Sequence, residues 1–401
     1  MYSKFNRAIM LVTASILSCA MFASCSQGGG AAGASGTYKI GGTGPLTGGA
    51  AIYGNAAKNG ATIAVEEIKA LGGIQFELNY QDDEHDAEKA VNAYNALKDW
   101  GMQIFLGSVT STPGVATSAE SNKDRIFFLT PSASSTEVLG GVADPLTGTV
   151  NTQRKDNVFQ MCFVDPNQGL ASAQYISDKK LASKIAVIYK NDDVYSIGIF
   201  NSFREKAEGL GLSIVSATTF TESSQNDFNV QLTEAKNAGA ELIFLPMYYT
   251  PASLILTQAK AMGYAPKFFG VDGMDGILTM DGFDKSLAEG VMLLTPFNAD
   301  AKDDKTVNFV KTYKDRFGEI PNQFAADGYD CVYAYYNALK QAGCTPGMKA
   351  SDICAKLIPL FTGSFSFDGL TGTGMKWDKT GAVTKSPKGM VIQNGAYVGM
   401  D

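Results

Sequence analysis

Short apolar runs alternate with segments of helical periodicity along most of the chain, and this alternation constrains the fold more than any single motif. Apolar runs lie around Ile40, Phe76 and Ile104, and apolar residues recur at helical spacing between them. Gly72-Gly73 is placed to end the first of these helices, and Asp86 to cap the second. Alternating strands and helices imply βαβ units, which build a parallel sheet. The sequence therefore predicts an α/β fold.

A second series of elements, which begins at Ile185, repeats the order of the first. The first and third strands of the two series are 64 and 58 residues apart, and the next strands follow after 23 and 25 residues. The residues that mark these strands are Ile40, Ile104 and Phe127 in the first series and Ile185, Ile243 and Phe268 in the second. Near-equal spacing predicts two similarly wound lobes, each with a doubly wound parallel sheet.

The segment from Met292 to Asp401 is neither a third copy nor a tail. Helical periodicity covers 305–317 and 326–342, and strand-like runs follow at 365–367 and 390–392. Because the segment is too short and irregular for a domain of its own, we expect it to complete both lobes and to cross between them in a multi-strand hinge. The predicted lobes are 37–164 plus 297–387 and 165–296 plus 388–401.

The N-terminus has the pattern of a secretory signal. Lys4 and Arg7 precede an uncharged run that extends to Ala23. This run is too short to cross a membrane comfortably as a helix. We therefore predict a signal peptide at 1–24 and an exported fold in the cell envelope.

The residues before Cys25 resemble the lipobox that directs lipidation of a cysteine, although Phe22 stands where leucine is usual. Cys19 competes for this role, but Leu17 fits poorly two residues before it. An ordinary secreted protein without lipid is the second alternative. We predict lipidation at Cys25, followed by a flexible linker of small residues at 25–36 that tethers the fold to the membrane.

The composition argues against two classes of protein. With 45% hydrophobic residues, the chain has enough apolar surface for real cores and is not a disordered protein. Its 33 Lys and Arg residues against 40 Asp and Glu residues give a net charge of −7, which argues against a nucleic-acid-binding surface.

Apart from Cys19 and Cys25, the chain has four cysteines, and their spacing matches no zinc-binding pattern; they are Cys162, Cys331, Cys344 and Cys354. Cys344 and Cys354 lie close enough in sequence to form a bridge. The alternative is that both are small buried apolar side chains, and the sequence leaves the two readings open.

Ligands of doubly wound sheets bind beyond the carboxyl ends of the strands. In the first lobe the loops there, 107–111 and 130–134, are rich in small hydroxyl residues. In the second lobe the corresponding loops carry aromatic and acidic residues, at 193–195, 247–249 and 270–273. Hydroxyls and helix N-termini hold anions, whereas carboxylates and aromatic rings hold cations. One side is therefore suited to an anion and the other to a cation with apolar bulk.

Five stretches of the sequence share a family pattern: Gly44-Pro45-Leu46-Thr47-Gly48 with Tyr53-Gly54, Ala64-Val65-Glu66-Glu67-Ile68 with Gly72-Gly73, Asp82-Asp83, Thr130-Pro131-Ser132-Ala133, and Ala186-Val187-Ile188-Tyr189. Together they resemble the type I periplasmic binding proteins of the leucine/isoleucine/valine-binding kind, and the resemblance covers nearly all of the chain from Tyr38. It implies a solute-binding lipoprotein that captures an amino acid or related amide between two lobes and delivers it to the permease of an ABC importer.

The resemblance also implies the residues of the site. It places the ligand carboxylate on Ser111, Ser132 and Ser134, and the ligand ammonium on Asp272. It places further ligand contacts on Val109, Tyr53, Tyr195, Tyr248 and Phe324.

The residues by themselves leave plainer roles open. Ser132 and Ser134 follow a proline and suit a helix cap. Asp272 lies between glycines and suits a turn. Tyr195 and Tyr248 suit ordinary packing, and Tyr249 competes with Tyr248 for the cleft.

Two departures from the family pattern stand out. Many relatives carry a disulfide at the positions that read His85 and Thr110 here, so that bridge is absent. His85, the single histidine, lies among acidic residues, and we expect an exposed loop there rather than a metal site. Asp272 is shorter than the glutamate of some branched-chain binders, so we expect a ligand that differs in size or amine position.

The sequence contains few of the residue patterns that are typical of enzymes. Gly42-Thr43-Gly44 resembles a dinucleotide fingerprint, but the next glycine, Gly48, is misplaced. One histidine leaves few triad or metal-hydrolase schemes. We predict a binding protein without catalytic activity, cofactor or metal. The alternative function is a sensing lipoprotein that presents a small molecule to a membrane receptor.

Overall fold

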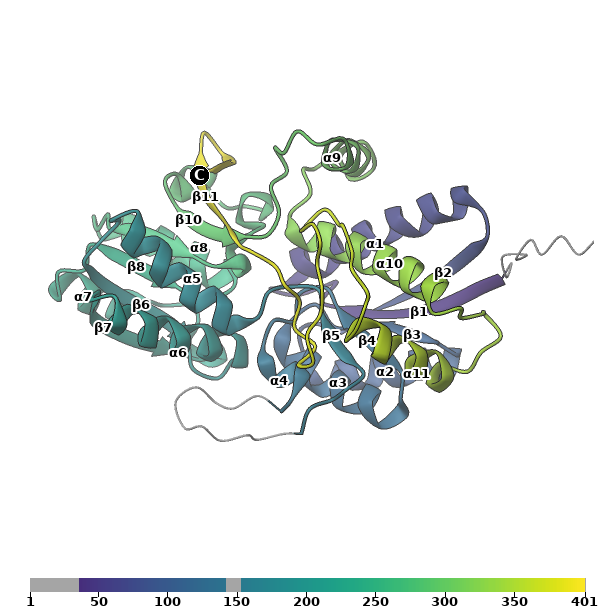
Figure 1. The fold of residues 1–401 in the computed structure, drawn as a ribbon. Coiled ribbons are helices and arrows are strands. Elements are labelled where there is room, and N and C mark those ends of the chain that lie inside the picture. The colour runs from purple at the N-terminus through teal and green to yellow at the C-terminus, as the bar shows by residue number, and fades with distance from the viewer. Residues whose placement is uncertain (1–35, 142–152, 401) are drawn as a thin grey trace, which may run out of the picture. The chain divides into compact units, whose positions relative to one another are not determined.

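A computed structural model describes residues 36–141 and 153–400 (Figure 1). Its first sheet has, within these residues, five parallel strands in the spatial order β2-β1-β3-β4-β5. These strands are β1 (Gly36–Gly44), β2 (Ile74–Asp82), β3 (Ile104–Leu106), β4 (Phe127–Thr130) and β5 (Val158–Gln160). The first strand begins at Gly36, the last residue of the predicted linker. The predicted signal peptide and lipidation site lie outside the described residues.

The second sheet has seven strands in the described chain, in the order β12-β11-β10-β9-β8-β6-β7. They are β6 (Lys184–Lys190), β7 (Ser213–Phe220), β8 (Leu242–Leu245), β9 (Lys267–Gly270), β10 (Met292–Thr295), β11 (Lys388–Gln393) and β12 (Ala396–Gly399). β6 to β10 pair in parallel, whereas β11 and β12 are antiparallel additions at one edge.

The register of the strands confirms that the two lobes are similarly wound. In the first sheet Ile40 pairs with Ile104, which in turn pairs with Phe127. In the second sheet Ile243 pairs with Phe268. The equal spacings in the sequence therefore correspond to equivalent strands, and the predicted α/β fold with two doubly wound lobes is correct.

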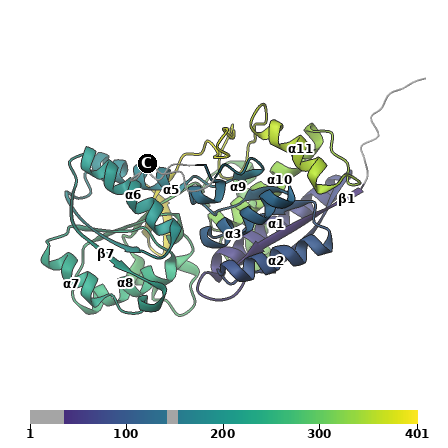
Figure 2. The same ribbon diagram turned by 90° about the horizontal axis from the view of Figure 1, so that it is seen from below.

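Helices cover both faces of each sheet. They are α1 (Ala51–Leu71), α2 (Ala87–Trp100), α3 (Ser111–Asp124), α4 (Thr136–Leu139), α5 (Asp165–Asp178), α6 (Val194–Gly209), α7 (Asn229–Asn237), α8 (Tyr249–Ala261), α9 (Asp304–Phe317), α10 (Gln323–Gln341) and α11 (Ala350–Phe361). Short 3-10 turns are η1 (Glu222–Ser224), η2 (Asp272–Met274), η3 (Ile277–Thr279) and η4 (Lys285–Ala288). In the second lobe α5 and α6 lie on one face of the sheet and α7 and α8 on the other (Figure 2). No helix within the described ranges has the length and apolar content needed to span a membrane.

The predicted helix signals act as expected. The Asp86 carboxylate accepts the N–H of Lys89 at 2.8 Å and so caps α2. α1 ends at Leu71, where Gly72 and Gly73 take positive φ angles of 73° and 82°. Only glycine adopts such angles without strain, so the pair ends the helix.

The C-terminal part of the chain serves both lobes. α9, α10 and α11 pack on the first lobe, whereas β10, β11 and β12 belong to the second sheet. The described chain passes between the lobes at 161–164, at 296–303 and again shortly before β11. The lobe boundaries of the sequence analysis lie close to these passages and stay a prediction.

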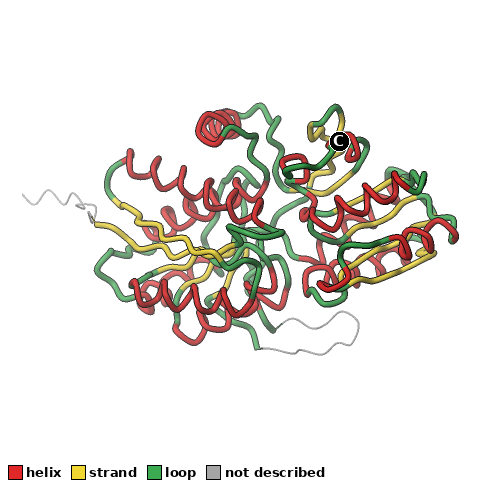
Figure 3. Tube along the Cα trace, turned by 180° about the vertical axis from the view of Figure 1, so that it is seen from behind, coloured by secondary structure: helices red, strands yellow, loops and turns green. Residues whose placement is uncertain are grey.

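One strand prediction is wrong. The run at 365–367 forms no strand, and Phe367 makes only an isolated bridge with Met375. Figure 3 shows the strands gathered in two sheets, each flanked by helices. Phe365 is buried because its ring stacks on Trp377 and packs against Phe361. Its apolar character therefore anchors a loop to α11 and does not mark a strand.

The cysteines settle an alternative that the sequence left open. Cys344 and Cys354 are both free thiols and both buried. The proposed bridge between them is wrong, and they are the small buried side chains of the other reading.

α1 and α10 lie side by side across the first lobe because two glycines allow a close approach (Figure 1). A Cβ atom on Gly60 would lie 1.8 Å from the carbonyl oxygen of Ala325, and one on Gly328 would lie 2.3 Å from that of Ala57. Each helix therefore presents a backbone surface to the other, with no room for a methyl group at these points.

Replacing Gly60 by alanine should lower the free energy of unfolding by about 1–3 kcal/mol, the usual cost of overpacking. The greater helix propensity of alanine offsets at most about 1 kcal/mol. Chemical denaturation measures this difference. Gly209→Ala is the matched control, because a Cβ there meets nothing within 4 Å. Equal stabilities of the two variants would contradict the close packing of α1 on α10.

Candidate functional site

The predicted site residues follow the carboxyl ends of strands in both sheets. Ser111 begins α3 after β3, and Ser134 lies in the loop after β4. In the second lobe Tyr195 follows β6, Tyr248 follows β8, and Asp272 follows β9. Parallel strands deliver their carboxyl ends to the same edge of a sheet, which explains why residues far apart in sequence meet here.

The hydroxyl side of the site is ordered by its own hydrogen bonds. Ser111 Oγ accepts the N–H of Ser135 at 3.1 Å, and Ser132 Oγ donates to the carbonyl of Val109 at 2.6 Å. Ser135 caps α4, so the alternative that Ser132 or Ser134 caps a helix is wrong. Thr110, the N-cap residue of α3, makes no side-chain bond to that helix. The helix therefore presents its N-terminus beside the serines, an arrangement that favours an anion.

The acidic side centres on Asp272, whose side chain is nearly inaccessible, with 3% of the residue exposed. The hydroxyl of Tyr195 donates to Asp272 Oδ1 at 2.5 Å. Burial raises the pKa of Asp272 to about 7, although the bonds from Tyr195 and Gln168 oppose this rise. Asp272 does begin the 3-10 turn η2, as the plainer alternative expected, but its side chain is buried and not hydrated. A cation that entered the site would relieve the cost of this buried charge.

Aromatic rings form a continuous wall between the two sides. Tyr195 and Tyr248 stack at 4.8 Å with an interplanar angle of 10°. The ring centroid of Tyr53 lies 5.5 Å from that of Tyr248, 4.9 Å from that of Tyr249 and 4.3 Å from that of Phe324. Both competing tyrosines therefore reach Tyr53, but Tyr248 is the one that stacks on Tyr195 beside Asp272.

Gln168, a residue that the sequence analysis missed, connects the two sides. Its side-chain oxygen accepts the N–H of Asp272 at 3.3 Å, and its amide donates to Ser134 Oγ at 3.5 Å. Asp165, at the start of the same helix, is fully buried, and burial raises its pKa together with the charges of Asp272 and Asp193. Asp165 begins the helix that follows β5, so inspection of the strand ends would have found it, whereas Gln168 lies a turn further into that helix.

A second missed contact joins α10 to the acidic loop. The side-chain amide of Gln323 donates to the carbonyl of Asp272 at 2.9 Å, and its backbone N–H donates to Asp275 Oδ2 at 2.9 Å. Asp275 is buried, which raises its pKa to about 7. α10 packs on the first lobe, so these bonds link the first lobe to the loop that carries Asp272.

The expectation of an exposed loop at His85 is confirmed for Glu84 and Asp86, which are exposed, but not for His85 itself, which is half-buried. His85 Nδ1 lies 2.8 Å from Thr110 Oγ1, and its ring meets Tyr248 edge-on at 5.4 Å. A hydrogen bond thus joins the two positions at which many relatives carry a disulfide. The described part of the chain holds no group of three His, Cys, Asp or Glu residues arranged for a metal.

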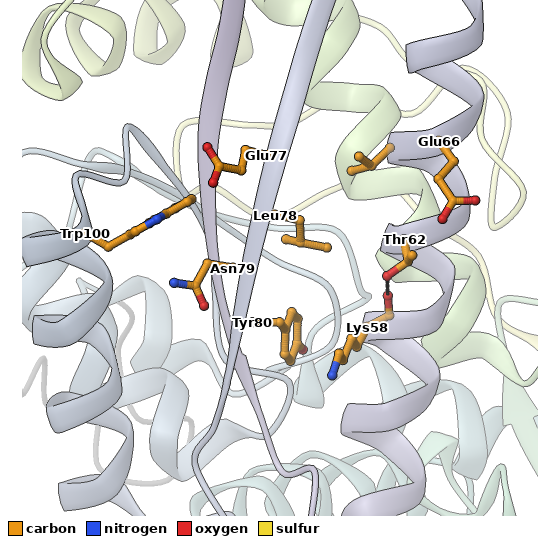
Figure 4. A pocket seen from close by; sticks show the side chains of 9 residues that line it. Lys58, Thr62, Glu66, Glu77, Leu78, Asn79, Tyr80 and Trp100 are labelled. Atoms are coloured by element: carbon orange, nitrogen blue, oxygen red, sulfur yellow. Dashed lines mark hydrogen bonds between the residues drawn. The ribbon is translucent and has the colours of Figure 1, made fainter.

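Two cavities deserve comparison. A small one of about 130 Å³ is lined by His85, Asp193 and Tyr248, residues of both lobes. A larger one of about 530 Å³ lies between α1 and the edge strand β2, where Lys58, Glu77 and other polar side chains surround it (Figure 4). No predicted ligand residue lines the larger cavity, so its size does not make it the ligand site.

Replacing Tyr195 by phenylalanine should raise the pKa of Asp272 further in the ligand-free protein, because the tyrosine hydroxyl favours the ionised carboxylate. Carbon-13 NMR titration of the aspartate carboxyl groups measures this. Tyr189→Phe serves as control, since that ring stacks on Phe200. An unchanged pKa in Tyr195→Phe would contradict the bond between Tyr195 and Asp272.

Comparison with known proteins identifies the family. Residues 37–387 match the family described as periplasmic binding protein. A leucine-, isoleucine-, valine-, threonine- and alanine-binding protein of Pseudomonas aeruginosa is 25% identical over 313 residues, which are 77% of this chain and 80% of the relative.

Solved structures give the same result. A leucine-binding protein from Thermotoga maritima has a TM-score of 0.79 and 26% identity, and the match covers 91% of this chain and 98% of that one. A branched-chain amino acid transporter substrate-binding protein from Streptococcus pneumoniae, solved with isoleucine, has a TM-score of 0.77 and 28% identity over 90% and 98% of the two chains. The chain therefore belongs to the type I periplasmic binding proteins of the leucine/isoleucine/valine-binding family.

Proposed function

We propose that this solute-binding protein captures an α-amino acid or a related amide between its two lobes and delivers it to an ABC importer. The observation that carries the proposal is the opposition of hydroxyls and carboxylate. Ser134 and Asp272 lie on different lobes and are connected through the two ends of the Gln168 side chain. A ligand that bears a carboxylate and an ammonium group a short distance apart matches this pair of surfaces.

Each ligand group has a partner of suited chemistry. Ser111 and the N-terminus of α3 would hold the carboxylate, while Asp272 would hold the ammonium. Tyr195 and Tyr248 present stacked rings beside Asp272, and an aromatic face favours a desolvated cation. Tyr53, Phe324 and Val109 would contact the ligand's apolar part.

Binding would couple to closure of the lobes. The ligand first meets the hydroxyl-rich loops, and the lobe that carries Asp272 then closes on it. Because contacts from both lobes exist only in the closed state, the ligand shifts the equilibrium toward that state.

We further propose that the protein is exported and held at the membrane through a lipid on Cys25, with residues 25–36 as the tether. The support is the signal-like N-terminus and the family's place outside the cytoplasm. No catalytic role is proposed.

Replacing Asp272 by asparagine should weaken amino-acid binding by roughly 30- to 1,000-fold, the cost of removing one partner of a buried charged pair. Isothermal titration with a panel of L-amino acids, amides, dipeptides and short-chain acids measures this. Asp281→Asn, an exposed aspartate of the same lobe, is the control. Unchanged binding in Asp272→Asn would refute the ammonium assignment, and unchanged binding in Ser111→Ala as well would show that the site lies elsewhere.

Affinity for such a ligand should fall as the pH drops below 7. In the ligand-free protein the pKa of Asp272 is raised to about 7, so the carboxylate is protonated below that pH. It must lose this proton before it can pair with the ligand's ammonium group. Linkage predicts about a tenfold rise in Kd per pH unit between pH 7 and 5. Titrations in buffers of different ionisation enthalpy would count the released protons. A pH profile equally steep in Asp272→Asn would assign the effect to another group, such as Asp275.

A further inference from the structure

The hydroxyl of Tyr53 lies at the seam between the lobes and bonds to the second lobe twice. It donates to the carbonyl of Gly273 and accepts the N–H of Tyr249 at 3.0 Å. Tyr53 belongs to α1 of the first lobe, whereas Gly273 lies in η2 and Tyr249 begins α8. The hydroxyl donates its one proton to the carbonyl and accepts the N–H with a lone pair. It therefore satisfies two buried backbone groups of the opposite lobe at once.

The ring of Tyr53 is held from its own lobe. Its centroid lies 4.3 Å from that of Phe324, which belongs to α10, and the whole side chain is fully buried. Burial raises the pKa of Tyr53 well above its usual value, so the hydroxyl keeps its proton. The side chain is therefore a fixed arm that reaches from the first lobe to the second.

Gly273 continues the chain of bonds into the candidate site. Its N–H donates to the hydroxyl of Tyr195 at 2.9 Å, and this hydroxyl donates to Asp272 Oδ1 at 2.5 Å. A Cβ on Gly273 would lie 2.6 Å from the Tyr195 hydroxyl and 2.7 Å from the carbonyl oxygen of Met247. Gly273 is thus held at its N–H by Tyr195 and at its carbonyl by Tyr53, in a space that has no room for a Cβ.

We propose that the Tyr53 hydroxyl is a latch for the closed state, which couples closure of the lobes to the position of the loop that carries Asp272. The inference rests on the proposed function and adds a positioning residue to it. In an open form the hydroxyl, the Gly273 carbonyl and the Tyr249 N–H would all bond to water. The latch therefore stabilises the closed form and leaves the open form unaffected, and a differential contribution of this kind shifts a two-state equilibrium.

Tyr53→Phe tests the latch because it keeps the ring and removes the two bonds. In the closed form it leaves two buried backbone groups unpaired, and we expect Kd for L-leucine to rise about 10- to 100-fold, mainly through faster dissociation. The unliganded melting temperature should fall only slightly, because the two bonds exist only in the closed fraction of the molecules. Titration calorimetry, stopped-flow dissociation and thermal unfolding provide these readouts.

A second measurement needs no ligand. Spin labels on Lys69→Cys and Lys236→Cys, exposed positions of the first and second lobes, report the distribution of distances between the lobes. Tyr53→Phe should shift the ligand-free distribution toward longer distances. A distribution that does not move in Tyr53→Phe overturns the latch, whether or not L-leucine binds.

Tyr335→Phe is the matched control. Its buried hydroxyl donates to the carbonyl of Phe105 at 2.6 Å, a bond inside the first lobe. This variant should melt earlier and leave both the distance distribution and the dissociation rate unchanged. If Tyr53→Phe behaves as this control does, Tyr53 has a structural role only. If wild type fails to bind L-leucine but Tyr53→Phe still shifts the distances, the latch stands and the proposed ligand class is wrong.

Discussion

Asp272 is buried between the lobes, and its closest donor is the neutral hydroxyl of Tyr195. A hydrogen bond of this kind reduces the cost of a buried carboxylate but does not remove it, because no opposite charge is supplied. The raised pKa of Asp272 reflects the part of the desolvation cost that the hydrogen bonds do not offset. The surrounding architecture fits this constraint: two lobes and a set of aromatic rings exclude water from Asp272, and the positive charge of the proposed ligand would complete the site.

Much of the fold follows from the sequence because periodicity and spacing are local properties that a parallel sheet preserves. Ile40, Ile104 and Phe127 lie in consecutive register in the sheet, as their spacing predicts. Asp86 begins α2 through a hydrogen bond to a residue three positions later, and Gly72 ends α1 through its own backbone angle. The strand prediction at 365–367 failed because burial of Phe365 comes from Trp377, a partner that no local pattern reveals.

The site was predictable in part and for a different reason. Serines and Asp272 stand in loops that strand order brings together, so inspection of strand ends finds them. The bonds that unite these loops come from Gln168 and Gln323, which lie far away in the chain. His85 shows the same limit, since acidic neighbours in sequence suggested solvent while its actual neighbours are Thr110 and Tyr248. Chemistry of a loop can be read from its residues, but its contacts depend on the whole fold.

In sequence, most of the second lobe is inserted between two parts of the first, and this order affects how the chain folds. The carboxylate of Glu67 on α1 accepts the hydroxyl of Tyr329 on α10, 262 residues later. All of the second lobe's parallel strands are synthesised between these two helices, so that lobe can form its β6–β10 core while α1 still lacks its neighbour. Contacts of such long range slow folding, because the intervening loop must close before they form. The apolar face of α1 that α10 later covers therefore stays uncovered until α10 has been synthesised.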